Sequence, residues 1–291
     1  MEPKGLKRKL QEGLACNKNG YFDSYKDNIY NNVMDQEYQK MFDKGSGSEL
    51  HSKAEAVHSS SMLSYNLFHW IKNGNTFTFE GVEYKRVYFE VQMRTLSCRS
   101  NPANMDIVLD GIDSNGKRHL LFVESKFTEY LSNNSFKLSE SYLKEKNWYN
   151  KKIDWSFIIN KAEEICRNKC YGEGIKQAIT HLFGINGLYG DERALVWLNQ
   201  QGMLNITDLE TIEIQFANFI FEPDCKCFYK EHQAYSNYID LYTEFVQSLP
   251  NGIVLPKIYS YSNVWEMMKN QIQDCQLKNF VEKRYMNYAQ K

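Results

Sequence analysis

The chain has 291 residues, of which 42% are hydrophobic and 24% are charged, and this composition excludes wholesale disorder. At about 100–200 residues per domain, the length allows one large domain or two small ones. The 35 basic and 36 acidic residues leave a net charge of -1, which excludes a global positive field, so any nucleic-acid-binding surface has to be a local patch.

No membrane or export signal is evident in the sequence. The first residues are charged, but no apolar run of signal-peptide type follows them, and nowhere do about 18 apolar residues occur together. We therefore expect a cytoplasmic protein with no membrane segment. The seven cysteines are odd in number and form no C-x-x-C pair, so we interpret them as reduced thiols. A zinc site drawn from Cys166, Cys170, Cys225 and Cys227 is an alternative, although no histidine lies at ligand spacing from them.

The N-terminal quarter of the chain is predicted to be helical. Residues 1–48 are polar and predict a helical N-terminal extension. Apolar residues over 49–73 recur at helical spacing, which predicts an amphipathic helix. Serines 59–61 are poor helix formers, so either this helix is interrupted or a small-residue face packs closely against a neighbour.

The pattern then changes to strands. β-branched and aromatic residues alternate over 74–95 around a turn at Glu80-Gly81, and two more strands are predicted at 104–111 and 119–127. The intervening segment is rich in turn-forming residues. Helical spacing follows over 142–183.

The remainder of the chain is predicted to contain two strands and a helical tail. The segments 194–200 (ALVWLNQ) and 211–223 (TIEIQFANFIFEP) are predicted as strands, the first of them buried because it is nearly all apolar. From Ala234 onward the stretches are helix-like, with a Pro/Gly break at 249–252.

The hairpin formed by the strands at 104–111 and 119–127 would bring two acids together. If residues 114–116 form a three-residue loop with Gly116 in the left-handed conformation, the numbers of paired residues sum to 230. Asp106 then lies directly across from Glu124, with Cβ atoms about 4.5–5.5 Å apart, and two like charges in this position are destabilising. Lys126 shares the face of Glu124, but a single flexible ammonium does not neutralise both carboxylates. A divalent cation such as Mg²⁺ (or Mn²⁺), which prefers hard carboxylate oxygens, would do so.

Such an ion beside a lysine is suited to hydrolysis of a phosphodiester, because the lysine can orient or help deprotonate a water molecule. Glu-x-Lys alone has little specificity. The pattern also occurs at Glu2/Lys4 and Glu83/Lys85, where a solvated pair is the simpler interpretation. The pair at 124 and 126 differs because it lies on an apolar strand with an acidic partner.

The downstream helix adds a polar pair. Gln177 and His181 are four residues apart and so share one helical face. A polar surface stripe is the alternative interpretation of this pair.

Asp106, then Glu124-Ser125-Lys126, then a helical Gln177 resemble the PD-(D/E)XK nuclease superfamily over roughly residues 45–200. The segments GSGSEL, HSSSMLSYNLF, YFEVQM, NMDIVLDG, FVESKF and GIKQAITHLFGI are together similar to a group of predicted bacterial restriction endonucleases. The resemblance implies an α/β fold with a restriction-endonuclease-like core, in which a mixed central sheet is flanked by helices.

The resemblance also implies a domain organisation. Residues 1–48 would form the helical extension and 49–233 the nuclease-like core. Residues 234–291 would form a mainly helical C-terminal extension packed on the core.

The resemblance further implies Mg²⁺-dependent DNA cleavage. Asp106 and Glu124 would be the metal ligands, Lys126 would lie beside the water, and Gln177 would support the site. Met105 replaces the proline of the superfamily's name, so the local turn can differ.

Four more residues are weighed against this pattern. His181 takes the place of the tyrosine in the superfamily's helix motif Q-x-x-x-Y. Members often carry a further glutamate on an early helix, for which Glu49 is the candidate; a helix N-terminal acid favoured by the macrodipole is the alternative. Glu90 on the strand YFEVQM is a weaker candidate, facing either the metal or solvent. Asp110 shares a face with Asp106, but the register favours Asp106 because it places that residue beside Glu124.

DNA contacts are expected in two places. Residues 136–152 mix lysines, including Lys144 and Lys146, with aromatic side chains, as phosphate contacts and base stacking require. The alternative is a solvated amphipathic helix whose aromatic residues face the core. Arg94 and Arg99 lie in the segment before Asp106, where a substrate backbone would pass.

We therefore predict a metal-dependent DNA endonuclease of restriction type. A repair or structure-specific nuclease of the same superfamily is an alternative, and so is a non-cleaving nucleic-acid-binding module that keeps the fold. The intact Asp106, Glu124 and Lys126 argue against a non-cleaving module, since a degenerate site tends to lose its charged residues first. Cutting of both DNA strands would favour a homodimer, although no dimer surface is evident in the sequence.

Overall fold

A computed structural model of the chain describes residues 5–45, 49–98, 101–132, 134–167 and 169–288. At its centre is a six-stranded sheet with strand order β1-β2-β3-β4-β5-β6. β1 to β4 pair antiparallel, whereas β4 to β6 pair parallel, so the sheet is mixed as predicted. The strands are β1 (Phe77–Phe79), β2 (Val82–Met93), β3 (Ala103–Asp113), β4 (Arg118–Lys126), β5 (Ile212–Ile220) and β6 (Pro256–Ser260).

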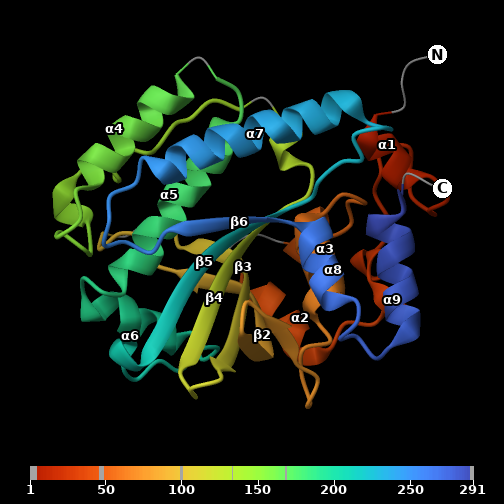
Figure 1. Cartoon of the computed structure of the whole chain (residues 1–291), viewed down its shortest axis with the longest axis horizontal. Coiled ribbons are helices and arrows are strands. Elements are labelled where there is room, and N and C mark those ends of the chain that lie inside the picture. Colours follow the sequence, from red (N-terminus) through yellow and green to blue (C-terminus); the bar gives the residue numbers. More distant parts are fainter. Residues whose placement is uncertain (1–4, 46–48, 99–100, 133, 168, 289–291) are drawn as a thin grey trace.

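Helices cover both faces of this sheet (Figure 1). α5 packs against β2 and β3 on one face, with α4 and α7 beside it, whereas α2, α3 and α8 lie on the other side. The predicted α/β class is confirmed. The helices are α1 (Leu6–Gln11), α2 (Gln36–Lys44), α3 (Ser60–Phe68), α4 (Trp155–Cys166), α5 (Gly172–Gly187), α6 (Glu192–Gln200), α7 (Tyr229–Gln247), α8 (Tyr261–Met268) and α9 (Cys275–Val281).

The two predicted hairpins are confirmed. Between β1 and β2, Glu80 and Gly81 both have positive φ, 49° and 80°, as a two-residue turn that matches the strand twist requires. Between β3 and β4, Gly116 has φ 80°, and the N–H of Asp113 donates to the carbonyl of Lys117 at 3.0 Å. This turn closes the three-residue loop on which the predicted register depends.

The predicted helix over 49–73 is interrupted, because residues 54–59 are not helical. Glu49–Lys53 form a separate short helical segment, η3, and α3 begins only at Ser60. The Ser59 side chain accepts the N–H of Met62 at 3.3 Å, so it acts as the N-cap of α3. The first of the two alternatives, an interrupted helix, is confirmed.

The prediction of a strand at 194–200 is wrong, because this segment belongs to helix α6. Asp191 caps the helix by accepting the N–H of Arg193 at 2.9 Å, and Ala194 and Leu198, four residues apart, turn the same face to the core. A short apolar run fits a buried strand and a buried helical segment equally well. Here the acidic cap and first turn favour the helix.

The C-terminal region contributes a strand that was not predicted. β6 extends the sheet by pairing parallel to β5, and α8 follows it directly. Buried apolar residues of both terminal regions, such as Phe42 and Tyr261, belong to the same hydrophobic cluster as the central sheet. Within the residues that the structure describes, no helix is long and apolar enough to cross a membrane.

Candidate active site

The β3–β4 hairpin brings Asp106 and Glu124 together at one end of the two strands. The ladder pairs Ile107 with Val123, and the next residues in that register are Asp106 and Glu124, as predicted. The backbone N–H of Ser125 donates to Oδ2 of Asp106 at 2.6 Å. The strand that carries Glu124 therefore also holds the carboxylate of Asp106 in place.

Glu124 forms a buried ion pair with Lys126. Both side chains are about 5% exposed, and Nζ of Lys126 donates to Oε1 of Glu124. Burial opposes ionisation of Glu124, but the charge of Lys126 outweighs it and lowers the pKa of this carboxyl. Burial opposes ionisation of Lys126 as well, and the attraction of Glu124 nevertheless raises the pKa of its ammonium. Both partners are thus charged at neutral pH.

The same site holds more acid than this lysine can neutralise. Burial, followed by repulsion from Glu124 and Glu90, raises the pKa of Asp106 well above its usual range. Burial and then the charge of Glu49 raise the pKa of Glu90 to about 8. The clash of like charges predicted for Asp106 and Glu124 is therefore present, and it includes additional carboxyl groups.

Glu90 reaches the site through an unusual backbone conformation. The β2–β3 ladder pairs Phe89 with Ile107 and Val91 with Met105 but skips the pair between them. Glu90 has φ 52°, which is rare for a residue with a side chain and is typical of functional sites where strain is stored. Oε2 of its buried carboxyl group accepts a hydrogen bond from Nδ2 of Asn104 at 2.9 Å.

Glu49 lines the cavity from η3. Oε1 accepts from Nζ of Lys53 at 2.6 Å, and Oε2 accepts from Oγ of Ser61 at 3.4 Å. Glu49 is buried, whereas the side chain of Lys53 is 68% exposed. The structure thus places the predicted early glutamate near the other acids; its catalytic role stays a prediction.

Helix α5 contributes His181 and Gln177. The His181 ring is buried, with Nε2 3.1 Å from the carbonyl oxygen of Asn104 and Nδ1 3.4 Å from Oε2 of Glu124. Nδ1 has no hydrogen-bond partner within the described ranges. Gln177 is half-buried one turn earlier and lines the same cavity, on the predicted shared helix face.

These side chains surround a cavity of about 510 Å³. Five of its lining residues are acids and two are lysines, so its walls carry a surplus of negative charge. The lining residues are Glu49, Lys53, Ser60, Ser61, Glu90, Ala103, Asn104, Asp106, Glu124, Ser125, Lys126, Glu129, Gln177, Thr180 and His181.

The donor atoms suit a hard divalent cation. Mg²⁺ commonly binds to one or two carboxylates and keeps several water molecules. Asp106 and Glu124 supply that pair, and the raised pKa of Asp106 indicates that its charge lacks full compensation. Among the described residues, no group of three or more His, Cys, Asp or Glu side chains is placed to hold a metal ion, so an ion here would depend on this pair and on water. A structural zinc site needs four protein ligands, and the cysteines of the described residues form no such cluster.

Three of the predicted DNA-contacting residues, Arg94, Lys144 and Lys146, are described by the structure, and they do not line this cavity. Arg94 lies over the ring of Trp197, 5.5 Å from its centroid. Lys144 is 3.8 Å from Glu140, and Lys146 is exposed. Their contacts with DNA stay predictions, and Arg99 lies outside the described residues.

Asp110, the acid that shares a face with Asp106, has a structural partner instead. Its two oxygens accept from Nε and Nη2 of Arg118 at 2.9 and 2.8 Å. This bidentate pair neutralises Asp110 within the hairpin.

The support behind the site was not predicted from the sequence. On the opposite face of β4 from Glu124, Oγ of Ser125 lies 2.6 Å from the hydroxyl oxygen of Tyr261, which also lies 3.3 Å from Oγ of Ser64. Tyr261 is fully buried at the start of α8. The only available signal was the alternation of β4, which turns Ser125 away from Glu124; its partner, 136 residues further on, could not be found from spacing.

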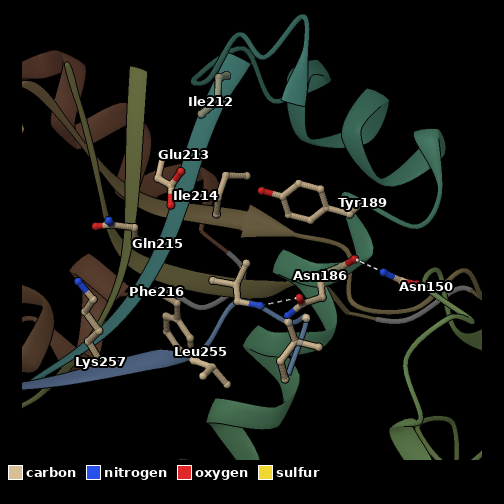
Figure 2. A pocket seen from close by; sticks show the side chains of 13 residues that line it. Asn150, Asn186, Tyr189, Ile212, Glu213, Ile214, Gln215, Phe216, Leu255 and Lys257 are labelled. Carbon is tan, nitrogen blue, oxygen red and sulfur yellow. Dashed lines mark hydrogen bonds between the residues drawn. The ribbon is translucent and has the colours of Figure 1, made fainter. Parts of the chain in front are cut away.

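A second hollow, of about 740 Å³, lies beside β5 (Figure 2). Its two charged lining residues are paired elsewhere: Glu213 with Lys117 at 2.7 Å and Lys257 with Glu80 at 2.6 Å. Asn186 accepts the N–H of Val254 at 2.9 Å and braces the adjacent loop. This hollow brings together no acid–lysine cluster of the kind found at Glu124.

The α/β fold thus brings acids and a buried lysine together on adjacent strands. A family model described as Restriction Endonuclease associating with ARP matches residues 5–181, more than half of the chain, and the chain belongs to this family. The matched segment contains the five acids of the cavity, Lys126 and Gln177, and ends at His181. Membership indicates a nuclease of the restriction-endonuclease type, for which DNA is the substrate. Comparisons with curated proteins and with solved structures gave no significant match.

Proposed function

We propose that the chain is a metal-dependent DNA endonuclease with an active site of the PD-(D/E)XK type. The observation that carries the proposal is the convergence of Asp106 and Glu124 beside the buried Lys126, with negative charge left uncompensated. Family membership supports the same class of activity. A hard divalent cation held by Asp106 and Glu124 would activate water as a nucleophile and offset the charge that develops on the phosphate.

Lys126 acts as a charged donor in this proposal. Its raised pKa keeps the ammonium protonated, so it cannot accept a proton from water at neutral pH. It can instead donate a hydrogen bond to the attacking water or to a phosphate oxygen, where it stabilises charge in the transition state. Glu124, bonded to Lys126 through Oε1, fixes the direction of that ammonium.

Asp106 is held ready as a ligand by the backbone of the next strand. Its Oδ2 accepts the N–H of Ser125. This hydrogen bond orients the carboxylate without involving Oδ1. Gln177 and Glu49 lie at the cavity wall, where they can position water or the sugar–phosphate backbone.

Incubation of supercoiled plasmid with the protein and Mg²⁺ or Mn²⁺ tests the proposal. We expect nicking or linearisation by the wild type, and a loss of about 100-fold or more in rate in Glu124→Gln and Lys126→Met. Glu213→Gln, a surface acid in the same sheet, serves as the matched control and should cut normally. Absence of cutting with either metal, or equal cutting by all variants, would refute the assignment. Thermal unfolding of each variant verifies that it is folded.

A further inference from the structure

A basic groove lies next to the acidic cavity. It has a volume of about 770 Å³, and α2 and the first half of β2 form its walls. Lys40, Lys44, Lys72, Lys85 and Arg86 line it together with a single acid, Glu37. In a chain whose net charge is -1, this is a marked local concentration of positive charge.

Three of these cations have no carboxylate partner. Lys72 and Lys85 pair with Asp35 and Glu83. Within the described part of the chain, no carboxylate lies at ion-pair distance from Lys40, Lys44 or Arg86, and Nζ of Lys44 makes only a long contact of 3.4 Å to the carbonyl of Gln201. All three are exposed. Their charges are therefore free to meet an anionic ligand.

Both walls of the groove lead to the acidic cavity. On the α2 side, Gly45 follows Lys44, and a Cβ at Gly45 would lie 3.3 Å from Nδ2 of Asn104 and 3.4 Å from Cβ of Glu90. Asn104 and Glu90 both line the cavity. On the β2 side, Tyr88 precedes Glu90 by two residues, about 7 Å along a strand.

Cationic side chains at a sheet edge can prevent pairing with another chain, but this role explains only part of the positive charge in the groove. β1 pairs only with Val82–Tyr84, and charged residues such as Lys85 and Arg86 on the following edge discourage pairing with another chain. That explanation does not apply to Lys40 and Lys44, which belong to a helix. Cations on two different elements that face one groove indicate a ligand with several negative charges.

We propose that this groove binds the phosphate backbone of DNA beside the cleaved bond. The inference rests on the proposed nuclease function, because it assigns the substrate's path to that site. The two tyrosines of the groove, Tyr38 and Tyr88, are buried and cannot stack on bases. The groove therefore positions DNA through phosphates and carries no direct sequence information.

Fluorescence anisotropy with a labelled duplex, in the presence of EDTA so that no cutting occurs, tests this inference. The groove variant combines Lys40→Gln, Lys44→Gln and Arg86→Gln. The control variant combines Lys26→Gln, Lys230→Gln and Lys283→Gln, which remove the same charge from exposed positions elsewhere. We expect at least tenfold weaker binding at low salt for the groove variant only. The slope of log affinity against log salt should fall by about 2–3, since each phosphate contact contributes about 0.9.

Three outcomes would overturn the inference. In the first, the two triple variants lose DNA affinity equally. In the second, the groove variant binds DNA like the wild type. In the third, poly-glutamate is used as a second probe and the groove variant loses binding to it but not to DNA, which would indicate an acidic protein partner. Plasmid cutting distinguishes this inference from the proposed function. If DNA binding depends on the groove but the wild type cuts DNA with neither Mg²⁺ nor Mn²⁺, only the nuclease proposal is refuted. A groove variant that cuts and binds normally would refute the groove alone.

Discussion

Nδ1 of His181 lies 3.4 Å from Oε2 of Glu124, while Nε2 of the same ring lies 3.1 Å from the carbonyl oxygen of Asn104. A carbonyl oxygen only accepts, so Nε2 carries the proton of a neutral ring and Nδ1 turns its lone pair toward the carboxylate. Burial lowers the pKa of His181 despite the attraction of Glu124, which favours this neutral form. Two acceptors that face each other repel, and a cation bound at the carboxylate would relieve this repulsion.

The first prediction concerns the tautomer of this ring. In metal-free protein at neutral pH, we expect ¹⁵N NMR of labelled histidine to show His181 as a neutral ring protonated at Nε2. Addition of a divalent cation should shift the Nδ1 resonance, because the ion changes the charge at the facing carboxylate. His232, a half-buried residue beside Glu222, serves as the internal reference. An Nδ1-protonated or doubly protonated ring would contradict this arrangement.

The second prediction is a loss of stability with rising pH in metal-free protein. The pKa of Glu90 rises from 4.5 to about 8 on folding, and that of Asp106 also rises. Above the unfolded-state pKa values, the native state therefore binds more protons than the unfolded state, so the free energy of unfolding falls as pH increases. Each such group lowers it by up to about 1.4 kcal/mol per pH unit until its folded pKa is passed.

The window from pH 6.5 to 8 isolates this effect. Buried histidines act in the opposite direction at lower pH; burial lowers the pKa of His69 to about 4, for example. Urea unfolding across the window should give a falling stability for the wild type and a shallower slope for Glu90→Gln. Glu145→Gln, an exposed acid, should follow the wild type. Parallel slopes for Glu90→Gln and the wild type would show that Glu90 is ionised in the native state.

The third prediction concerns the support behind β4. Tyr261→Phe removes the hydroxyl that lies 2.6 Å from Oγ of Ser125. We expect a loss of about 1–2 kcal/mol in the free energy of unfolding, because a buried hydrogen bond is broken. Ser125 holds Asp106 through its backbone, so kcat for DNA cleavage should fall while KM stays the same.

The matched control is Tyr229→Phe, whose ring is 73% exposed. It should change neither stability nor kcat. A Tyr261→Phe variant that is destabilised but cuts at the wild-type rate would limit Tyr261 to a structural role.

The central hairpin could be predicted from sequence because local features determine it. Gly116 supplies the positive φ of the loop, and the period of two in the strands then sets which side chains face each other. The pairing of Asp106 with Glu124 follows from these two facts alone. The serine cap of α3 is a similarly local signal.

Features that depend on distant contacts could not be predicted. β6 has only five residues and is a strand because β5 offers a parallel edge to it. The positive φ of Glu90, which carries its carboxyl into the cavity, arises from skipped pairing with β3 and leaves no sequence pattern. The basic groove is likewise assembled from α2 and β2, whose lysines are about 40 residues apart in the chain.

Calorimetric titration of Mn²⁺ into the metal-free protein tests most directly whether Asp106 and Glu124 together form a cation site. We expect saturable binding by the wild type, and affinity at least tenfold weaker in both Asp106→Asn and Glu124→Gln. Asp110→Asn, the strand acid that pairs with Arg118, should bind like the wild type. Unchanged affinity in the first two variants, or an equal loss in all three, would contradict the account.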